Sequence, residues 1–95
     1  MNKYLQILIK NVRKQLEAWL NNKERIQEKE LYRFLHSIVG TASTIGFHKG
    51  GEIAQKLMSQ LDENDEKDWL KEDLQDFLFP LISIFYYEEI SNINE

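Results

Sequence analysis

The sequence has 95 residues, 42% of them hydrophobic, and carries a net charge of −4 at pH 7. This length has room for a single domain, residues 1–95, around one hydrophobic core, and not for two domains. The absence of cysteine excludes a disulfide framework and a thiolate metal site and agrees with a reducing compartment, so we expect a cytoplasmic location.

The charge is unevenly distributed along the chain. Residues 1–30 carry seven Lys/Arg and four Asp/Glu, residues 31–61 three and one, and residues 62–95 two and eleven. Nucleic acid is not an expected partner, because the basic excess is small and forms no stripe. No membrane span is expected either, since the apolar run Phe77–Tyr87 contains Pro80 and is shorter than the roughly 20 residues that a span needs. The first ten residues also lack the features of a secretory signal.

Apolar residues that recur at every third or fourth position predict helices. Four helices are expected, over residues 2–20, 28–45, 50–62 and 66–90. The connections between them are short and polar, which favours neighbouring helices of opposite direction. We therefore expect an all-α fold, an antiparallel up-down four-helix bundle.

Local signals place the ends of these helices. Gly46 suits the C-terminal end of the second helix, because glycine readily adopts the left-handed conformation. The pair Gly50 and Gly51 leaves the start of the third helix open by several residues. Asp65 is the expected N-cap of the fourth helix. In that helix Pro80 is expected to cause a kink and not a break, since the apolar pattern continues in register beyond it.

The fourth helix has a second apolar line, formed by Phe79, Ile82 and Tyr86. In a bundle each helix contacts two neighbours, so this line is either buried within the domain or forms the surface of a homodimer or a partner helix. The sequence leaves both alternatives open.

His36 is the most informative residue of the chain. The apolar stripe of its helix centres on Ile38, and at about 100° per residue His36 lies about 160° away from it, facing solvent. Gly40 follows one turn later, although glycine within a helix costs about 1 kcal/mol relative to alanine. Either Gly40 keeps the surface beside the imidazole clear, or it allows a neighbouring helix to pack closely and His36 is an ordinary surface histidine.

The stretch His36–Gly46 resembles the signature of histidine-containing phosphotransfer (HPt) domains of two-component phosphorelays. That signature is roughly H-x-x-K-G-x-A-x-x-x-G, on the second helix of a four-helix bundle. His36, Gly40, Ala42 and Gly46 occupy the matching positions without a gap. Val39 departs from the pattern, because the family usually has lysine there.

The resemblance implies that His36 accepts a phosphoryl group from an aspartate of a receiver domain and passes it on. It implies no cofactor of the domain itself and a Mg²⁺ ion on the receiver. Other implied partners are a histidine kinase or further domains of the same protein. The residues expected to contact the receiver surround His36 on the helix surface: Lys29, Tyr32, Arg33, Val39, Gly40 and Ser43.

Two alternatives remain beside this prediction. Arg33 and Lys29 either attract the acidic pocket or the phosphoryl oxygens, with Val39 as an apolar docking contact, or they form a solvated helix face. Without the usual lysine, the domain is alternatively a non-transferring interaction or dimerisation module. His48 is a weaker nucleophile candidate, because it lies beside a glycine pair.

No metal site is expected from the sequence. His36 and His48 do not have the spacing of a His-Glu-x-x-His zinc site. The acidic stretch Asp62–Asp68 lacks the glycine and the closing glutamate of a calcium-binding loop, so a solvated turn is the expected structure.

Overall fold

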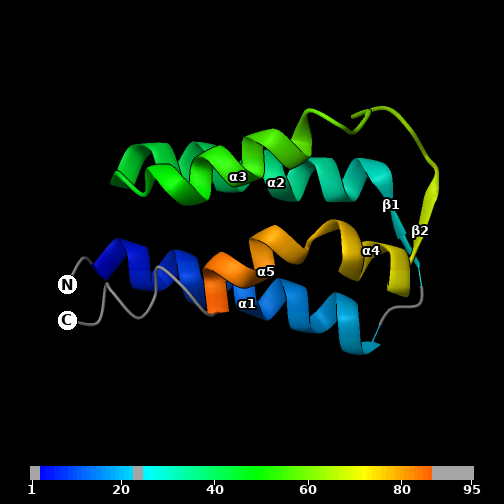
Figure 1. The fold of residues 1–95 in the computed structure, drawn as a ribbon, viewed down its shortest axis with the longest axis horizontal. Helices are drawn as coiled ribbons and strands as arrows, with labels where there is room; N and C mark the ends of the chain where they lie inside the picture. Colours follow the sequence, from blue (N-terminus) through cyan, green and yellow to red (C-terminus); the bar gives the residue numbers. More distant parts are fainter. Residues whose placement is uncertain (1–2, 23–24, 87–95) are drawn as a thin grey trace.

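The structure, a computed structural model, describes residues 3–22 and 25–86. The elements follow one another in the order α1 (Lys3–Asn22), β1 (Arg25–Gln27), α2 (Glu28–Ile45), α3 (His48–Met58), β2 (Asp68–Leu70), α4 (Lys71–Phe77) and α5 (Phe79–Tyr86). Figure 1 shows α2 and α3 in one layer, and α1 with α4 and α5 in the other. The fold is therefore predominantly helical, as predicted from the sequence.

Within the described residues there are five helices, and the expected fourth helix is divided into α4 and α5. The single residue Leu78 lies between them, with φ −86° and ψ 2°. Proline has no N–H to donate and crowds the carbonyl four residues before it, which here belongs to Asp76. Pro80 instead lies in the first turn of α5, where no N–H is required. The expectation of a kink within one continuous helix was wrong.

The ends of the other helices also differ in part from those predicted. Helix α2 begins and ends at the predicted residues, whereas α3 begins at His48, two residues early, and ends at Met58 instead of residue 62. Helix α4 begins at Lys71 instead of residue 66, and its N-cap is Leu70, not Asp65. The Oδ1 atom of Asp65 accepts a hydrogen bond from the N–H of Lys67 at 2.8 Å, so this carboxylate closes a local turn. The expected helical residues 2 and 87–90 lie outside the described residues.

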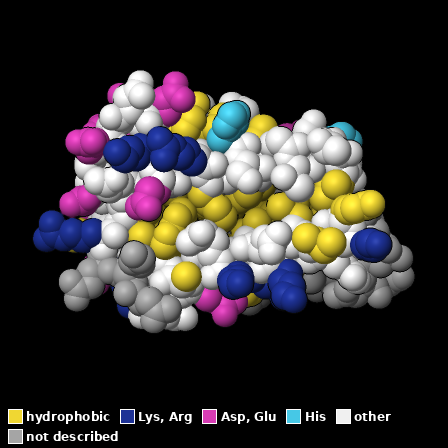
Figure 2. All heavy atoms as spheres, turned by 180° about the vertical axis from the view of Figure 1, so that it is seen from behind, with side chains coloured by type: hydrophobic (Ala, Val, Ile, Leu, Met, Phe, Trp, Pro, Cys, Tyr) yellow, Lys and Arg dark blue, Asp and Glu magenta, His cyan; other side chains and the backbone are white. Residues whose placement is uncertain are grey.

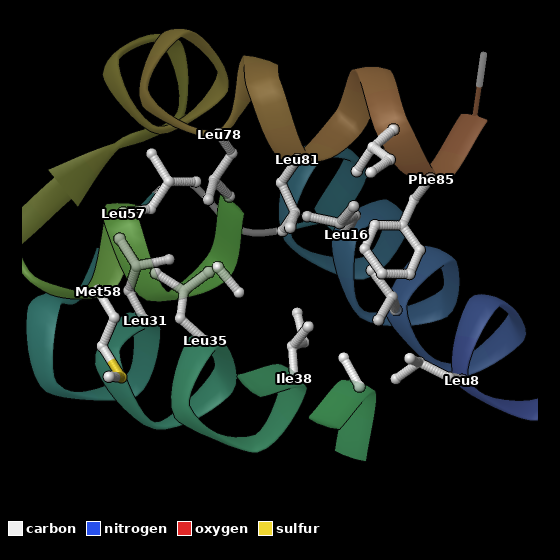
Figure 3. Close-up of a cluster of buried hydrophobic side chains, with 14 of the residues drawn as sticks. Leu8, Leu16, Leu31, Leu35, Ile38, Leu57, Met58, Leu78, Leu81 and Phe85 are labelled. Atoms are coloured by element: carbon white, nitrogen blue, oxygen red, sulfur yellow. The ribbon is translucent and has the colours of Figure 1, made fainter. Parts of the chain in front are cut away.

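Apolar side chains from every helix meet in one core between the two layers. Figure 3 shows side chains of α1, α2, α3 and α5, together with Leu78, pointing toward one another. Leu31, Leu35, Leu78, Leu81 and Phe85 are fully buried. The regular three- and four-residue spacing of these side chains fixes which face of each helix is buried and which remains outside.

A short antiparallel pairing of β1 with β2, which the sequence did not predict, joins the start of α2 to the segment before α4. Ile26 pairs with Trp69 at its centre. Glu28, the first residue of α2, is only 6% exposed and accepts two hydrogen bonds. The N–H of Asp62 donates to Oε2 and Nε1–H of Trp69 donates to Oε1, each at 2.9 Å. A buried carboxylate is stable here because both oxygens are paired and the helix N-terminus favours negative charge.

The turn from α2 to α3 depends on two glycines. Gly46 has φ 82° and caps α2 in the left-handed conformation, which confirms its predicted role. Gly50 lies against the buried ring of Phe47, and a Cβ atom at Gly50 would be 2.6 Å from Cε2 of that ring. Both glycines of the pair, Gly50 and Gly51, lie within α3. Glycine is needed at position 50 because the ring of Phe47 occupies the space that a side chain would fill.

The second apolar line predicted on the last helix packs mainly within the domain. Ile82 and Tyr86 are half-buried and line a hollow with Leu16 and Leu20 of α1. Tyr86 also donates a hydrogen bond to Glu17 at 3.0 Å. Phe79 is 65% exposed. These contacts favour the alternative in which most of this line is buried within the domain.

Candidate functional site

His36 lies on the outward-facing side of α2. Its side chain is exposed, whereas Leu35 and Ile38 beside it are buried in the core. This placement agrees with the position predicted from the helical period. A mid-helix residue has a fixed backbone, so the imidazole is presented to solvent from a rigid support.

Gly40, one turn after His36, borders open space. A Cβ atom built at this glycine would meet no other atom within 4 Å. The alternative in which Gly40 allows a neighbouring helix to pack closely is therefore wrong. Side chains on a helix lean toward its N-terminus, so the residue at position 40 is the one whose side chain would lie against His36. Glycine at this position keeps that space clear.

The space beside the imidazole is a shallow hollow on the surface of α2. It is lined by His36, Ser37, Gly40, Thr41, Thr44 and Ile45. The hydroxyl of Thr44 donates to the carbonyl of Gly40 at 3.0 Å. The hollow is thus open to solvent and lined partly by hydroxyl groups, and none of the described residues that line it is acidic.

A groove between α2 and α3 lies on one side of this surface. This groove, which we call the α2–α3 groove, is lined by Val39, Ser43, His48, Gly51, Glu52, Gln55 and Lys56. Val39 is half-buried there, and Lys56 brings a positive charge from α3. Lys56 could not be assigned to this surface from the sequence, because only the packing of α3 on α2 brings it to the groove that contains Val39.

A second groove, between α1 and α2, lies on the other side. Figure 2 looks onto this face and shows hydrophobic side chains gathered along the groove. Ile7 is 49% exposed at its edge, and Phe34, Ile38 and Ile45 contribute from α2. The outward side of α2 is thus a ridge between two partly apolar grooves.

The two basic residues predicted beside His36 differ in their surroundings. The ammonium group of Lys29 lies 3.3 Å from Oε1 of Glu66, so much of its charge is balanced within the domain. Arg33 is exposed and makes no ion pair with any described residue. Of the two, Arg33 is the cation available to a partner.

Tyr32, one turn before His36, contacts the imidazole. The centroids of the two rings are 6.2 Å apart, and the ring planes are inclined at 35°. The sequence placed Tyr32 on the same side as His36 but did not predict a ring contact. A four-residue spacing between two aromatic rings on a helix is the signal that indicates one.

The remaining residues give no sign of a metal centre. Across residues 3–22 and 25–86, no group of three or more His, Asp or Glu side chains is arranged to hold a metal ion. None of the helices in these ranges is long and apolar enough to cross a membrane.

The chain matches a known protein family over most of its length. A family model described as Hpt domain matches residues 3–84, from α1 into α5. The chain belongs to the Hpt domain family. Hpt domains function in histidine phosphotransfer in phosphorelays, where they interact with receiver domains and kinases. No curated protein and no solved structure matches the chain significantly.

This Hpt domain has two histidines in different settings. His36 lies in the middle of an 18-residue helix with Gly40 beside it, whereas His48 is the first residue of α3 and lines the α2–α3 groove. Both side chains are exposed. Only His36 combines exposure with a rigid mid-helix position and an unobstructed neighbouring turn.

Proposed function

We propose that His36 accepts a phosphoryl group from the aspartyl phosphate of a receiver domain and passes it to a further receiver. The observation that carries this proposal is the open space at Gly40 beside an exposed, mid-helix imidazole. A transferring histidine must be reached by a second protein along the line of the breaking bond, and the open space at Gly40 supports such an approach from that side.

The proposed step needs little from the domain itself. The unprotonated ring nitrogen of neutral His36 attacks phosphorus, a P–N bond forms, and the bond between phosphorus and the aspartate oxygen breaks. The electron pair of that bond remains on the aspartate, which leaves as a carboxylate. The other ring nitrogen keeps its proton. Mg²⁺ on the receiver would stabilise the charge on the phosphoryl oxygens, and this domain would supply no cofactor.

The receiver would dock on the ridge formed by Tyr32, Arg33, His36, Gly40 and Ser43. Arg33 is the exposed cation of this surface and is suited to an acidic pocket. Val39 would add an apolar contact from the adjoining groove. In this proposal α4 and α5 together act as the fourth helix of an antiparallel up-down bundle, and transfer takes place in the cytoplasm.

The alternative is a domain that binds its partner without accepting phosphate. It is favoured by one observation, the half-buried Val39 at the position where the family usually carries lysine. The variant Val39→Lys separates the two proposals. If only this variant accepts phosphate from receivers, the natural domain is a binding module; if both accept it, Val39 is compatible with transfer.

The proposal is tested by incubating the domain with each available receiver domain carrying a radiolabelled aspartyl phosphate. We expect at least one receiver to transfer its label to the domain as an acid-labile, alkali-stable phosphoramidate. Binding of a receiver without any transfer of label would support the non-transferring alternative.

A further inference from the structure

The side of His36 that faces the start of α2 is occupied by an aromatic ring. Tyr32 precedes His36 by four residues, and the ring centroids lie 6.2 Å apart, within the range of favourable aromatic contacts. Because helical side chains lean toward the N-terminus, the imidazole leans toward Tyr32. Gly40 contributes no side chain on the opposite side. The imidazole is therefore bounded on one side and open on the other.

Tyr32 is held more firmly than the histidine that it contacts. It is half-buried and packs against the hydrophobic core, whereas His36 is exposed. An exposed side chain on a helix otherwise rotates freely among its allowed rotamers. Contact with an anchored ring removes part of that freedom, so Tyr32 can fix the orientation of the imidazole.

We propose that Tyr32 is a positioning residue for phosphoryl transfer: it restricts rotation of the His36 ring and keeps one ring nitrogen toward the open side. This inference rests on the proposed function of His36. The two nitrogens of a histidine are chemically distinct, and either can form a phosphoramidate. A ring held in one orientation would present one nitrogen to the donor, whereas a freely rotating ring would present both.

The test uses the small molecule phosphoramidate as the phosphoryl donor, because it needs no docking surface on the domain. Its P–N bond breaks, ammonia leaves, and a new P–N bond forms on the imidazole. The rate of His36 phosphorylation and the ratio of the two phosphohistidine isomers are followed by ³¹P NMR. We expect one isomer to dominate in the natural protein. Tyr32→Phe keeps the ring and should preserve both the rate and the ratio.

Tyr32→Leu removes the ring and should change both readouts. We expect phosphorylation to slow by roughly two- to tenfold, the effect of immobilising one side chain, and the minor isomer to increase. Tyr4→Leu is the matched control, since Tyr4 is an exposed tyrosine that lies on α1 and not on the helix of His36. It should behave as the natural protein.

An unchanged rate and isomer ratio in folded Tyr32→Leu would overturn the inference. If that variant does not fold, nuclear Overhauser effects between the Tyr32 and His36 ring protons of the natural protein decide the question, and their absence would overturn it. Because phosphoramidate replaces the receiver, these results do not depend on docking. Failure of every receiver to label the domain would instead count against the proposed function.

Discussion

At the scale of single residues, Gly40 and Glu28 each cost folding free energy, but for different reasons. Gly40 accepts a lower helix propensity where nothing in the fold requires glycine, because the space around it is open and its φ is not positive. Glu28 is buried, which is costly for a carboxylate, but both of its oxygens accept hydrogen bonds from other parts of the fold. Under the proposed function, glycine at position 40 is explained by access to His36, whereas the buried Glu28 is explained by stability.

Substitution of Gly40 should separate stability from transfer. Both Gly40→Ala and Gly40→Gln should raise the free energy of unfolding by about 0.5–1 kcal/mol, because both residues favour a helix. Only the glutamine side chain is long enough to lie over His36, so Gly40→Gln should slow transfer from a receiver at least tenfold, while Gly40→Ala transfers nearly as well as the natural protein. Urea unfolding and the labelling assay measure the two effects. A glutamine variant that transfers normally would show that the hollow is not the route of approach.

Removal of the Glu28 carboxylate should destabilise the fold. Glu28→Ala leaves the N–H of Asp62 and Nε1–H of Trp69 without their acceptor, which we expect to lower the free energy of unfolding by about 2–3 kcal/mol. Urea denaturation measures this change. Glu63→Ala, which removes an exposed carboxylate from the residue next to Asp62, should change the free energy of unfolding by less than about 0.5 kcal/mol. Equal effects of the two substitutions would contradict the role given to Glu28.

At the scale of elements, the apolar period predicts the presence and the buried faces of the helices but not all of their limits. Helix α2 was placed correctly because its period is uninterrupted and Gly46 ends it. The division at Leu78 was missed because the period continues through α4 and α5, although Pro80 has no N–H to donate to the carbonyl of Asp76. The strands β1 and β2 have three residues each, too few for an alternating pattern to stand out.

The two neighbouring glycines of α3 should respond oppositely to alanine. A Cβ atom at Gly50 would lie 2.6 Å from the buried ring of Phe47, so Gly50→Ala should lower the free energy of unfolding by about 1–3 kcal/mol. At Gly51 the nearest atom, Cβ of Ala42, is 3.4 Å away, so Gly51→Ala should be neutral or stabilise by up to about 1 kcal/mol. Thermal or urea unfolding of both variants checks the sign. A stabilising Gly50→Ala would contradict the close packing of the Phe47 ring against Gly50.

At the scale of the whole molecule, the parts of the site that the sequence predicted are those set by one helix. The outward placement of His36 and the clear turn at Gly40 follow from the period of α2 alone. The pairing of Lys29 with Glu66, and the groove shared by Val39 and Lys56, could not be predicted in this way. They join residues that are far apart in sequence and depend on how the elements pack.

The most direct test of the central claim compares the two histidines. The natural domain, His36→Ala and His48→Ala are each incubated with a receiver that labels the natural domain, and the acid-labile phosphate on each is counted. Both substituted positions are exposed, so all three proteins should fold alike. We expect His48→Ala to be labelled to the natural level and His36→Ala to carry no label. Label that persists on folded His36→Ala would contradict the assignment of His36 as the phosphoryl acceptor.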